Sequence, residues 1–252
     1  MAESQTKIEN YKNPPIFLAI LEIRYKNSEL KNIEKLSECK NEVLKLFPNS
    51  QKQVVGELKL DNLLEGQPTI SQFNRKVDCF LYTSKDKQSE FTISLDRFNY
   101  RQSGSYTNFK DFTKNIKTVW KTHHELLKNI SIIGISLRFF NKIEIKENIK
   151  DPTDFFNISI QAANGVISDL ITNYSIRCIS RNIEKKKHSI ISLSLEPSIE
   201  SIFPFVLDID VHDENIFSND LKNLWDRFEV LRIEKDNLFN RILTEKTKSL
   251  FK

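Results

Sequence analysis

The longest strand-like segment of the chain places the strongest limit on its fold. Across Ser131–Ile145 every second residue is apolar or an amide, so one strand face would carry Ile133, Ile135, Leu137, Phe139, Asn141, Ile143 and Ile145. A strand with one continuous apolar face needs a second layer to cover that face. The segment therefore predicts a sheet with one covered side.

Helical periodicity supplies the covering layer. Asn108 can cap a helix over 108–129, and Asp220 can cap a second long helix near the C-terminus. A third helix is expected over 28–47, ended by Pro48. The helix capped by Asn108 carries an apolar stripe at Phe109, Phe112, Ile116, Val119, Trp120, His123 and Leu127. The helix capped by Asp220 carries one at Leu221, Leu224, Trp225, Phe228, Leu231, Leu238, Phe239 and Ile242.

Further strands are predicted from β-branched and aromatic runs bounded by turn residues, over 16–25, 54–60, 77–83, 170–183, 189–195 and 203–212, with a hairpin strand through Phe91, Ile93 and Leu95. This order predicts an α+β fold, a mostly antiparallel sheet packed by three amphipathic helices. We expect one unit over 1–252, in which Asp151-Pro152 separates sub-halves 1–150 and 151–252.

Charge is unevenly distributed along the chain. Residues 1–150 carry 25 Lys and Arg against 18 Asp and Glu, and residues 151–252 carry 13 against 16. Such asymmetry is typical of nucleic-acid faces and of self-association, and it permits a homo-oligomer. The chain has only five glycines and four alanines beside abundant lysine, as expected from an AT-rich genome. The basic pI alone therefore says little about partners.

Several classes of protein are disfavoured by what the sequence lacks. No run approaches the roughly 20 apolar residues that cross a bilayer, and no secretory signal is recognisable. Cys39, Cys79 and Cys178 are too widely spaced for a metal knuckle, so we expect reduced, buried thiols and a cytoplasmic location. Glycine-rich nucleotide loops and nucleophile motifs are missing as well, which favours a non-enzymatic protein without a cofactor.

One acidic cluster could carry chemistry. Asp208, Asp210 and His212 are two residues apart on a predicted strand and therefore share a face. Two carboxylates and an imidazole could hold a divalent cation, as in a metal-dependent hydrolase, or act as acid and base. The alternative is a solvated strand face. Arg138 is the natural ion-pair partner of Asp208 or Asp210 in either case.

The predicted helix over 108–129 also has a basic side. Its lysines recur at helical spacing opposite the apolar stripe, at Lys110, Lys114, Lys117, Lys121 and Lys128. A row of this kind, called the lysine ridge below, can contact phosphates without reading sequence. Solvated helices in a lysine-rich chain have the same pattern, so both interpretations stay open.

Three stretches together resemble a sporadically distributed prokaryotic family of about this length. They are Tyr11–Ile16 leading to Glu22-Ile-Arg24, the run Ile133–Ile143, and Asp208-Ile-Asp210 followed by Asn237–Thr244. Family members typically read Leu-Arg-Tyr-x-Asn at the centre, where this chain has Phe139-Phe140 before Asn141. The resemblance covers nearly the whole chain and implies one full-length unit.

No activity is assigned to that family, so the resemblance transfers no functional residue. Its patchy distribution is typical of mobile-element and phage-defence genes. We therefore expect a binding or regulatory protein of such a system, with a protein partner or small ligand and with Arg138 and Asn141 as candidate binding residues. A nucleic-acid-binding accessory using the lysine ridge is the second hypothesis, and the metal site at Asp208, Asp210 and His212 is the third.

Overall fold

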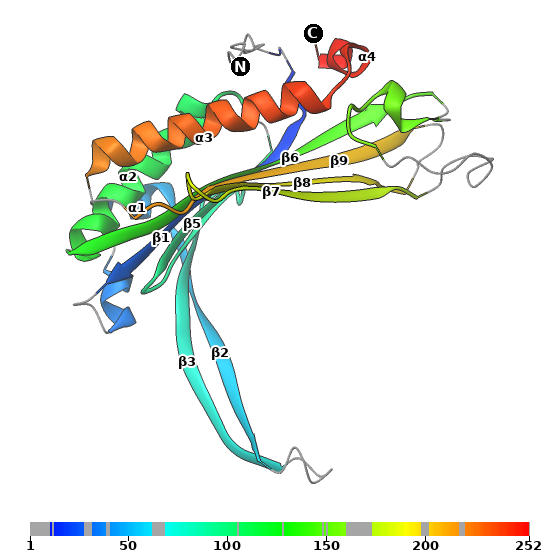
Figure 1. The fold of residues 1–252 in the computed structure, drawn as a ribbon. Helices are drawn as coiled ribbons and strands as arrows, with labels where there is room; N and C mark the ends of the chain where they lie inside the picture. Colours follow the sequence, from blue (N-terminus) through cyan, green and yellow to red (C-terminus); the bar gives the residue numbers. More distant parts are fainter. Residues whose placement is uncertain are drawn as a thin grey trace.

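A computed structural model shows one large sheet with helices on one side (Figure 1). The structure describes residues 11, 13–27, 32–38, 41–61, 69–104, 106–127, 129–147, 149, 151–159, 173–197, 202–216 and 220–251. Within them nine strands form an antiparallel sheet in the order β2-β3-β4-β5-β1-β6-β9-β8-β7. The predicted α+β class is confirmed.

The strands are β1 (Ile16–Asn27), β2 (Asn49–Asp61), β3 (Thr69–Thr83), β4 (Ser89–Ile93), β5 (Arg97–Ser103), β6 (Ile130–Ile145), β7 (Ser175–Asn182), β8 (Lys187–Leu195) and β9 (Phe203–Asp213). The α-helices are α1 (Asn41–Leu46), α2 (Phe109–Leu127), α3 (Leu221–Ile242) and α4 (Glu245–Lys248). Short 3-10 turns lie at Ile33–Ser37, Pro152–Asp154 and Ser249–Phe251. No helix among the described residues is both long and apolar enough to cross a membrane.

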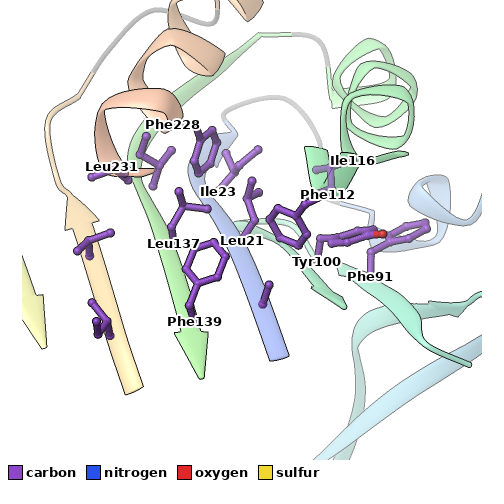
Figure 2. Packing of buried hydrophobic residues seen from close by; sticks show 14 of the residues in the cluster. Leu21, Ile23, Phe91, Tyr100, Phe112, Ile116, Leu137, Phe139, Phe228 and Leu231 are labelled. Carbon is purple, nitrogen blue, oxygen red and sulfur yellow. The ribbon is translucent and has the colours of Figure 1, made fainter. Parts of the chain in front are cut away.

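The core lies between the sheet and helices α2 and α3. Leu21 and Ile23 of β1 and Leu137 of β6 point toward Ile116 of α2 and Phe228 of α3 (Figure 2), and all five side chains are buried. The stripe predicted over 108–129 is the buried face of α2. Among the described residues no helix lies on the opposite face of the six neighbouring strands β5, β1, β6, β9, β8 and β7 (Figure 1). This face of the six strands is called the bare face below.

The predicted caps of both long helices are confirmed. The Asn108 side chain accepts a hydrogen bond from the Asp111 amide at 2.9 Å, at the start of α2. The Asp220 carboxylate accepts from the amides of Lys222 and Asn223 at the start of α3. Each cap satisfies amides that have no partner within the helix, which fixes where the helix begins.

The single helix predicted over 28–47 is wrong for the part that the structure describes. A 3-10 turn ends at Ser37, and α1 begins separately at Asn41. The Ser37 hydroxyl donates to the Glu34 carbonyl at 2.6 Å, which is the acceptor that a continuing helix would offer to the Glu38 amide. The Glu38 amide instead donates to the Lys35 carbonyl at 3.4 Å, the i to i−3 pattern of a 3-10 turn, and the turn ends there.

Three further details differ from expectation. Strand β5 was not predicted, although its buried Phe98 and Tyr100 alternate with more polar residues. Ile133 leaves the predicted buried face because β6 bulges there: Arg24 pairs with Gly134 and Tyr25 with Ile132. Cys178 is exposed, because it lies on the edge strand β7 while α3 packs on β6 and β9.

Strands β2 and β3 form an arm that leaves the sheet. They pair with each other from Asn49–Thr83 to Asp61–Thr69, but only Phe80–Thr83 of β3 also pairs with β4. The rest projects as a two-stranded ribbon (Figure 1). The strands predicted over 54–60 and 77–83 lie inside the arm and are shorter than observed, and residues 62–68 lie outside the described residues.

The sheet joins residues from both sides of Asp151-Pro152. Strand β9 pairs with β6 along its full length, from Asp213 opposite Ile135 to Phe203 opposite Ile145. Asp151 caps the 3-10 turn that begins at Pro152. The division into sub-halves 1–150 and 151–252 stays a prediction.

Candidate functional site

A cleft of about 630 Å³ opens between α2, α3 and the segment that precedes β1. Tyr11 and Pro14 form one wall, Tyr106 and Phe109 a second, and α3 a third. Capping by Asn108 places the first turn of α2 at the cleft, and the Tyr11 hydroxyl holds its wall by donating to Asn240 of α3 at 2.8 Å. The cleft is therefore built by segments far apart in sequence.

Lys235 is the most unusual residue of the cleft. Its side chain is only 7% exposed, and its ammonium lies 2.5 Å from a carboxylate oxygen of Asp236 and 4.4 Å from the centre of the Phe139 ring. Burial lowers the pKa of Lys235, and the adjacent Asp236 carboxylate opposes that shift. A buried ammonium is costly to keep, which makes this position a candidate for function.

Lys235 lies beside a row of alternating charges along α3, formed by Glu229, Arg232 and Asp236. The Arg232 guanidinium donates to Glu229 at 2.8 Å and to Asp236 at 2.6 Å. Because these residues are three and four apart, they share one side of the helix. Both carboxylates of the cleft are thereby engaged by α3's own cations, so they do not project free negative charge into it.

Aromatic rings and two further lysines complete the cleft. Tyr106 packs edge-on against Phe139, with ring centres 5.6 Å apart, and burial raises the pKa of its hydroxyl. Lys117 lies 5.3 Å from the centre of the Trp225 ring, and exposed Lys110 stands at the rim. Four cationic side chains therefore face two carboxylates among aromatic walls. Such a lining suits an organic anion.

The two residues singled out on β6 face opposite sides of the sheet. Asn141 lies at the cleft, buried, and donates to the Leu207 carbonyl of β9 at 2.9 Å and to its neighbour Phe139 at 3.3 Å. These bonds join β6 to β9 and satisfy the buried amide of Asn141. Arg138 lies on the bare face, where its guanidinium binds Asp208 through two hydrogen bonds of 2.9 and 2.7 Å. This is the predicted ion pair.

Asp208, Asp210 and His212 share the bare face, as predicted from their spacing. Their side chains are not gathered around one point: Arg138 holds both oxygens of Asp208, and the His212 ring lies 2.9 Å from Asp210. The His188 ring stacks on His212, with ring centres 4.1 Å apart. In the described part of the chain no three His, Cys, Asp or Glu side chains are arranged to hold a metal ion.

The lysine ridge follows α2 as expected for the residues that the structure describes. Lys110, Lys114, Lys117 and Lys121 are all exposed, whereas Lys128 lies outside the described residues. Lys110 and Lys117 also line the cleft, so the ridge and the cleft share two cations. His123, on the opposite side of α2, is buried and its Nδ1 lies 2.9 Å from the Val119 carbonyl.

Sequence reasoning missed most of the cleft, although one signal was present. The apolar stripe of α3 runs through Phe228, Leu231 and Phe239, and Lys235 occupies the position between the last two where an apolar residue would continue it. A lysine inside such a stripe is a signal of a buried cation. The sequence around Tyr106 and Arg232 gives no comparable sign that they line a cleft, because the two residues come close to each other only through the way α3 crosses the sheet.

Comparison with known proteins adds no assignment. No family model matches the sequence, and no curated protein matches it significantly. The resemblance to the sporadically distributed prokaryotic family therefore stays a prediction.

Proposed function

We propose that this protein binds a small organic anion with an aromatic group in the cleft between α2 and α3. The observation that carries the proposal is Lys235, an ammonium buried in the cleft wall beside an aromatic ring. Its retention costs stability unless a negative ligand uses it. The proposed activity is binding, in keeping with the expectation of a binding or regulatory protein.

The remaining lining supports this class of ligand. Arg232 and Lys235 are positioned by carboxylates, so they can meet a phosphate or carboxylate with little reorganisation. Trp225, Phe109 and Tyr106 offer apolar faces for a ring. A ligand with both features would use both parts of the cleft.

Four probes that do or do not combine an aromatic ring with a negative charge test the proposal. Thermal unfolding and calorimetric titration would be measured with AMP, phenyl phosphate, adenosine and inorganic phosphate. We expect AMP or phenyl phosphate to raise Tm more than adenosine or phosphate alone, because only the first two combine ring and charge. A ligand present at 100 times its Kd should stabilise the protein by about 2.7 kcal/mol. If none of the four probes raises Tm at 10 mM, the proposal fails.

Matched lysine variants locate the binding. Lys235→Met should abolish the Tm shift, whereas Lys248→Met should keep it, because Lys248 is also ion-paired but lies in α4. Equal shifts in both variants would place the bound anion elsewhere. Folding of each variant is checked by its own unfolding transition.

Nucleic-acid binding along the lysine ridge is a second candidate function. The observation in its favour is the exposure of Lys110, Lys114, Lys117 and Lys121 on one side of α2. Binding of this kind weakens steeply with salt. The double variant Lys114→Gln/Lys121→Gln, which leaves the cleft lining intact, should reduce retention of an oligonucleotide if the ridge is the interface.

A further inference from the structure

The bare face of the sheet carries an unusual share of the arginines. The chain has 28 lysines and 10 arginines, yet six of those arginines lie on this one face. Residues directly opposite each other on paired strands lie on the same face, and Arg24 is opposite Arg97 while Ile20 is opposite both Arg101 and Arg138. On β7, Arg177 and Arg181 are opposite Ser192 and His188 of β8, which are in turn opposite Asp208 and His212 of β9. The six are Arg24, Arg97, Arg101, Arg138, Arg177 and Arg181.

Codon bias does not account for this choice of cation. It supplies lysine by default in this chain, and on the bare face of β5 to β7 lysines stand only near strand ends, at Lys26 and Lys142. A guanidinium differs from an ammonium in being planar, in binding phosphate through two parallel hydrogen bonds and in stacking on rings. The use of arginine on this face therefore indicates a role that depends on those properties of the guanidinium.

Three of the arginines are held in place by acidic residues. Arg138 pairs with Asp208 and stacks 4.5 Å from the Phe140 ring centre, while Arg101 lies 3.3 Å from Glu90. Arg24 lies 3.5 Å from Glu22 and 3.6 Å from Glu214. Each of these four carboxylates therefore already faces an arginine, and Asp210 lies 2.9 Å from the His212 ring.

The other three arginines supply unneutralised charge. Arg97, Arg177 and Arg181 are exposed and make no ion pair with any described residue. Arg97 lies on β5, and the other two lie on the edge strand β7. Free positive charge therefore stands at both flanks of the face, with oriented arginines between.

The spacing of this charge indicates the shape of its partner. Five strand intervals separate β5 from β7, which at about 4.8 Å each is roughly 24 Å. That span exceeds a single phosphate and fits several linked phosphates. A broad sheet face does not enter a groove of duplex DNA, which admits a helix or a two-stranded ribbon, so a single strand fits better.

Ring surface is available between the flanks. Phe140 lies at the centre of the face beside Phe17, whose side chain is 41% exposed, with ring centres 6.1 Å apart. Bases of an unpaired strand stack on such rings and on guanidinium planes without regard to sequence. We propose that the bare face of the sheet binds single-stranded nucleic acid, independently of the ligand in the cleft.

Charge-matched variants on opposite faces test this proposal. Fluorescence anisotropy would follow labelled 15-mers of dT and of U at several salt concentrations. Arg97→Gln/Arg181→Gln should weaken binding on the order of tenfold and reduce the salt slope by about 1.4, the value for two phosphate contacts on a single strand. Lys114→Gln/Lys121→Gln removes the same charge from the lysine ridge and should change neither quantity.

Arg97→Lys/Arg181→Lys separates charge from guanidinium geometry. It should keep the salt slope and still lose affinity several-fold, because the paired hydrogen bonds and stacking are gone. All of the substituted side chains are exposed, so circular dichroism should show unchanged folding in each variant.

Three results would overturn the proposal. Loss of binding only in the lysine variant would place the interface on α2. Absence of binding to either 15-mer at low salt would exclude a nucleic acid on this face. Displacement of the 15-mer by polyglutamate of equal charge, at equal concentration, would show that an acidic protein segment is the better partner. None of these outcomes depends on the cleft, since AMP binding is measured separately.

Discussion

At the scale of single residues, stability and function compete at Lys235. The chain keeps an ammonium where its own helical pattern asks for an apolar side chain. Replacing a buried charge with an apolar residue of similar volume is often neutral or stabilising. The thermodynamic cost of Lys235 is therefore measurable apart from any ligand.

Lys235→Met should raise the free energy of unfolding by about 1 kcal/mol, because Asp236 keeps Arg232 as its partner after the substitution. Urea unfolding of the wild type and the variant measures the difference. A loss of 2 kcal/mol or more would instead mark Lys235 as an ion needed for folding, and would remove the main argument for the ligand cleft.

A buried imidazole predicts acid sensitivity. Burial lowers the pKa of His123 to about 4, although its bond to Val119 opposes the shift, against an ordinary value of 6.5. Between those values the unfolded chain binds a proton that the folded protein does not, so stability falls as pH falls from 6.5 toward 4. The whole loss is roughly 3 kcal/mol.

The variant His123→Leu isolates this contribution. It keeps a residue that fits among Tyr82, Phe91 and Phe98 and has no proton to bind. Between pH 6.5 and 5, where most carboxylates stay ionised, Tm of the wild type should fall more steeply than Tm of the variant. Parallel curves would show that His123 is not the responsible group.

At the scale of elements, the helix caps fix where the helices that line the cleft begin. Asp220 fixes the start of α3, the helix that carries Trp225, Arg232 and Lys235. Asp220→Ala should cost about 1 kcal/mol of stability, whereas Asp226→Ala, at an exposed position inside the same helix, should stay within about 0.5 kcal/mol. Similar costs in chemical denaturation would show that the cap does not limit stability.

The elements that could be predicted are those whose own residues determine them. Strand β6 and helices α2 and α3 have long periodic patterns, and both helices begin at the expected caps. The break after Ser37 could not be predicted, because the Glu38 amide bonds to Lys35 in a 3-10 pattern within a sequence of otherwise helical periodicity. The cleft required the crossing of α3 over the sheet, a tertiary contact that no local pattern encodes. The expected link to a defence or mobile-element system stays a prediction.

At the scale of the whole molecule, the arm and the sheet should differ in local stability. An isolated two-stranded ribbon is marginally stable in water, and the outer part of β2 and β3 has no other neighbour in the sheet. Amides of Val54 and Val55 should therefore exchange with deuterium orders of magnitude faster than those of Leu21 and Leu137. Exchange mass spectrometry measures both, and equal protection would show that the arm has a covering partner.

The order of the strands has a consequence for how the chain folds during synthesis. Strand β1 lies at the centre of the sheet between β5 and β6, and Leu21 finds its partners only at Tyr100 and Leu137. At roughly 5–20 residues per second, the ribosome needs several seconds to deliver these strands. Until then β1 emerges with two open edges and an apolar face. Folding should be slow, dominated by contacts distant along the chain, and nascent chains that end before β5 should be the species that chaperones bind.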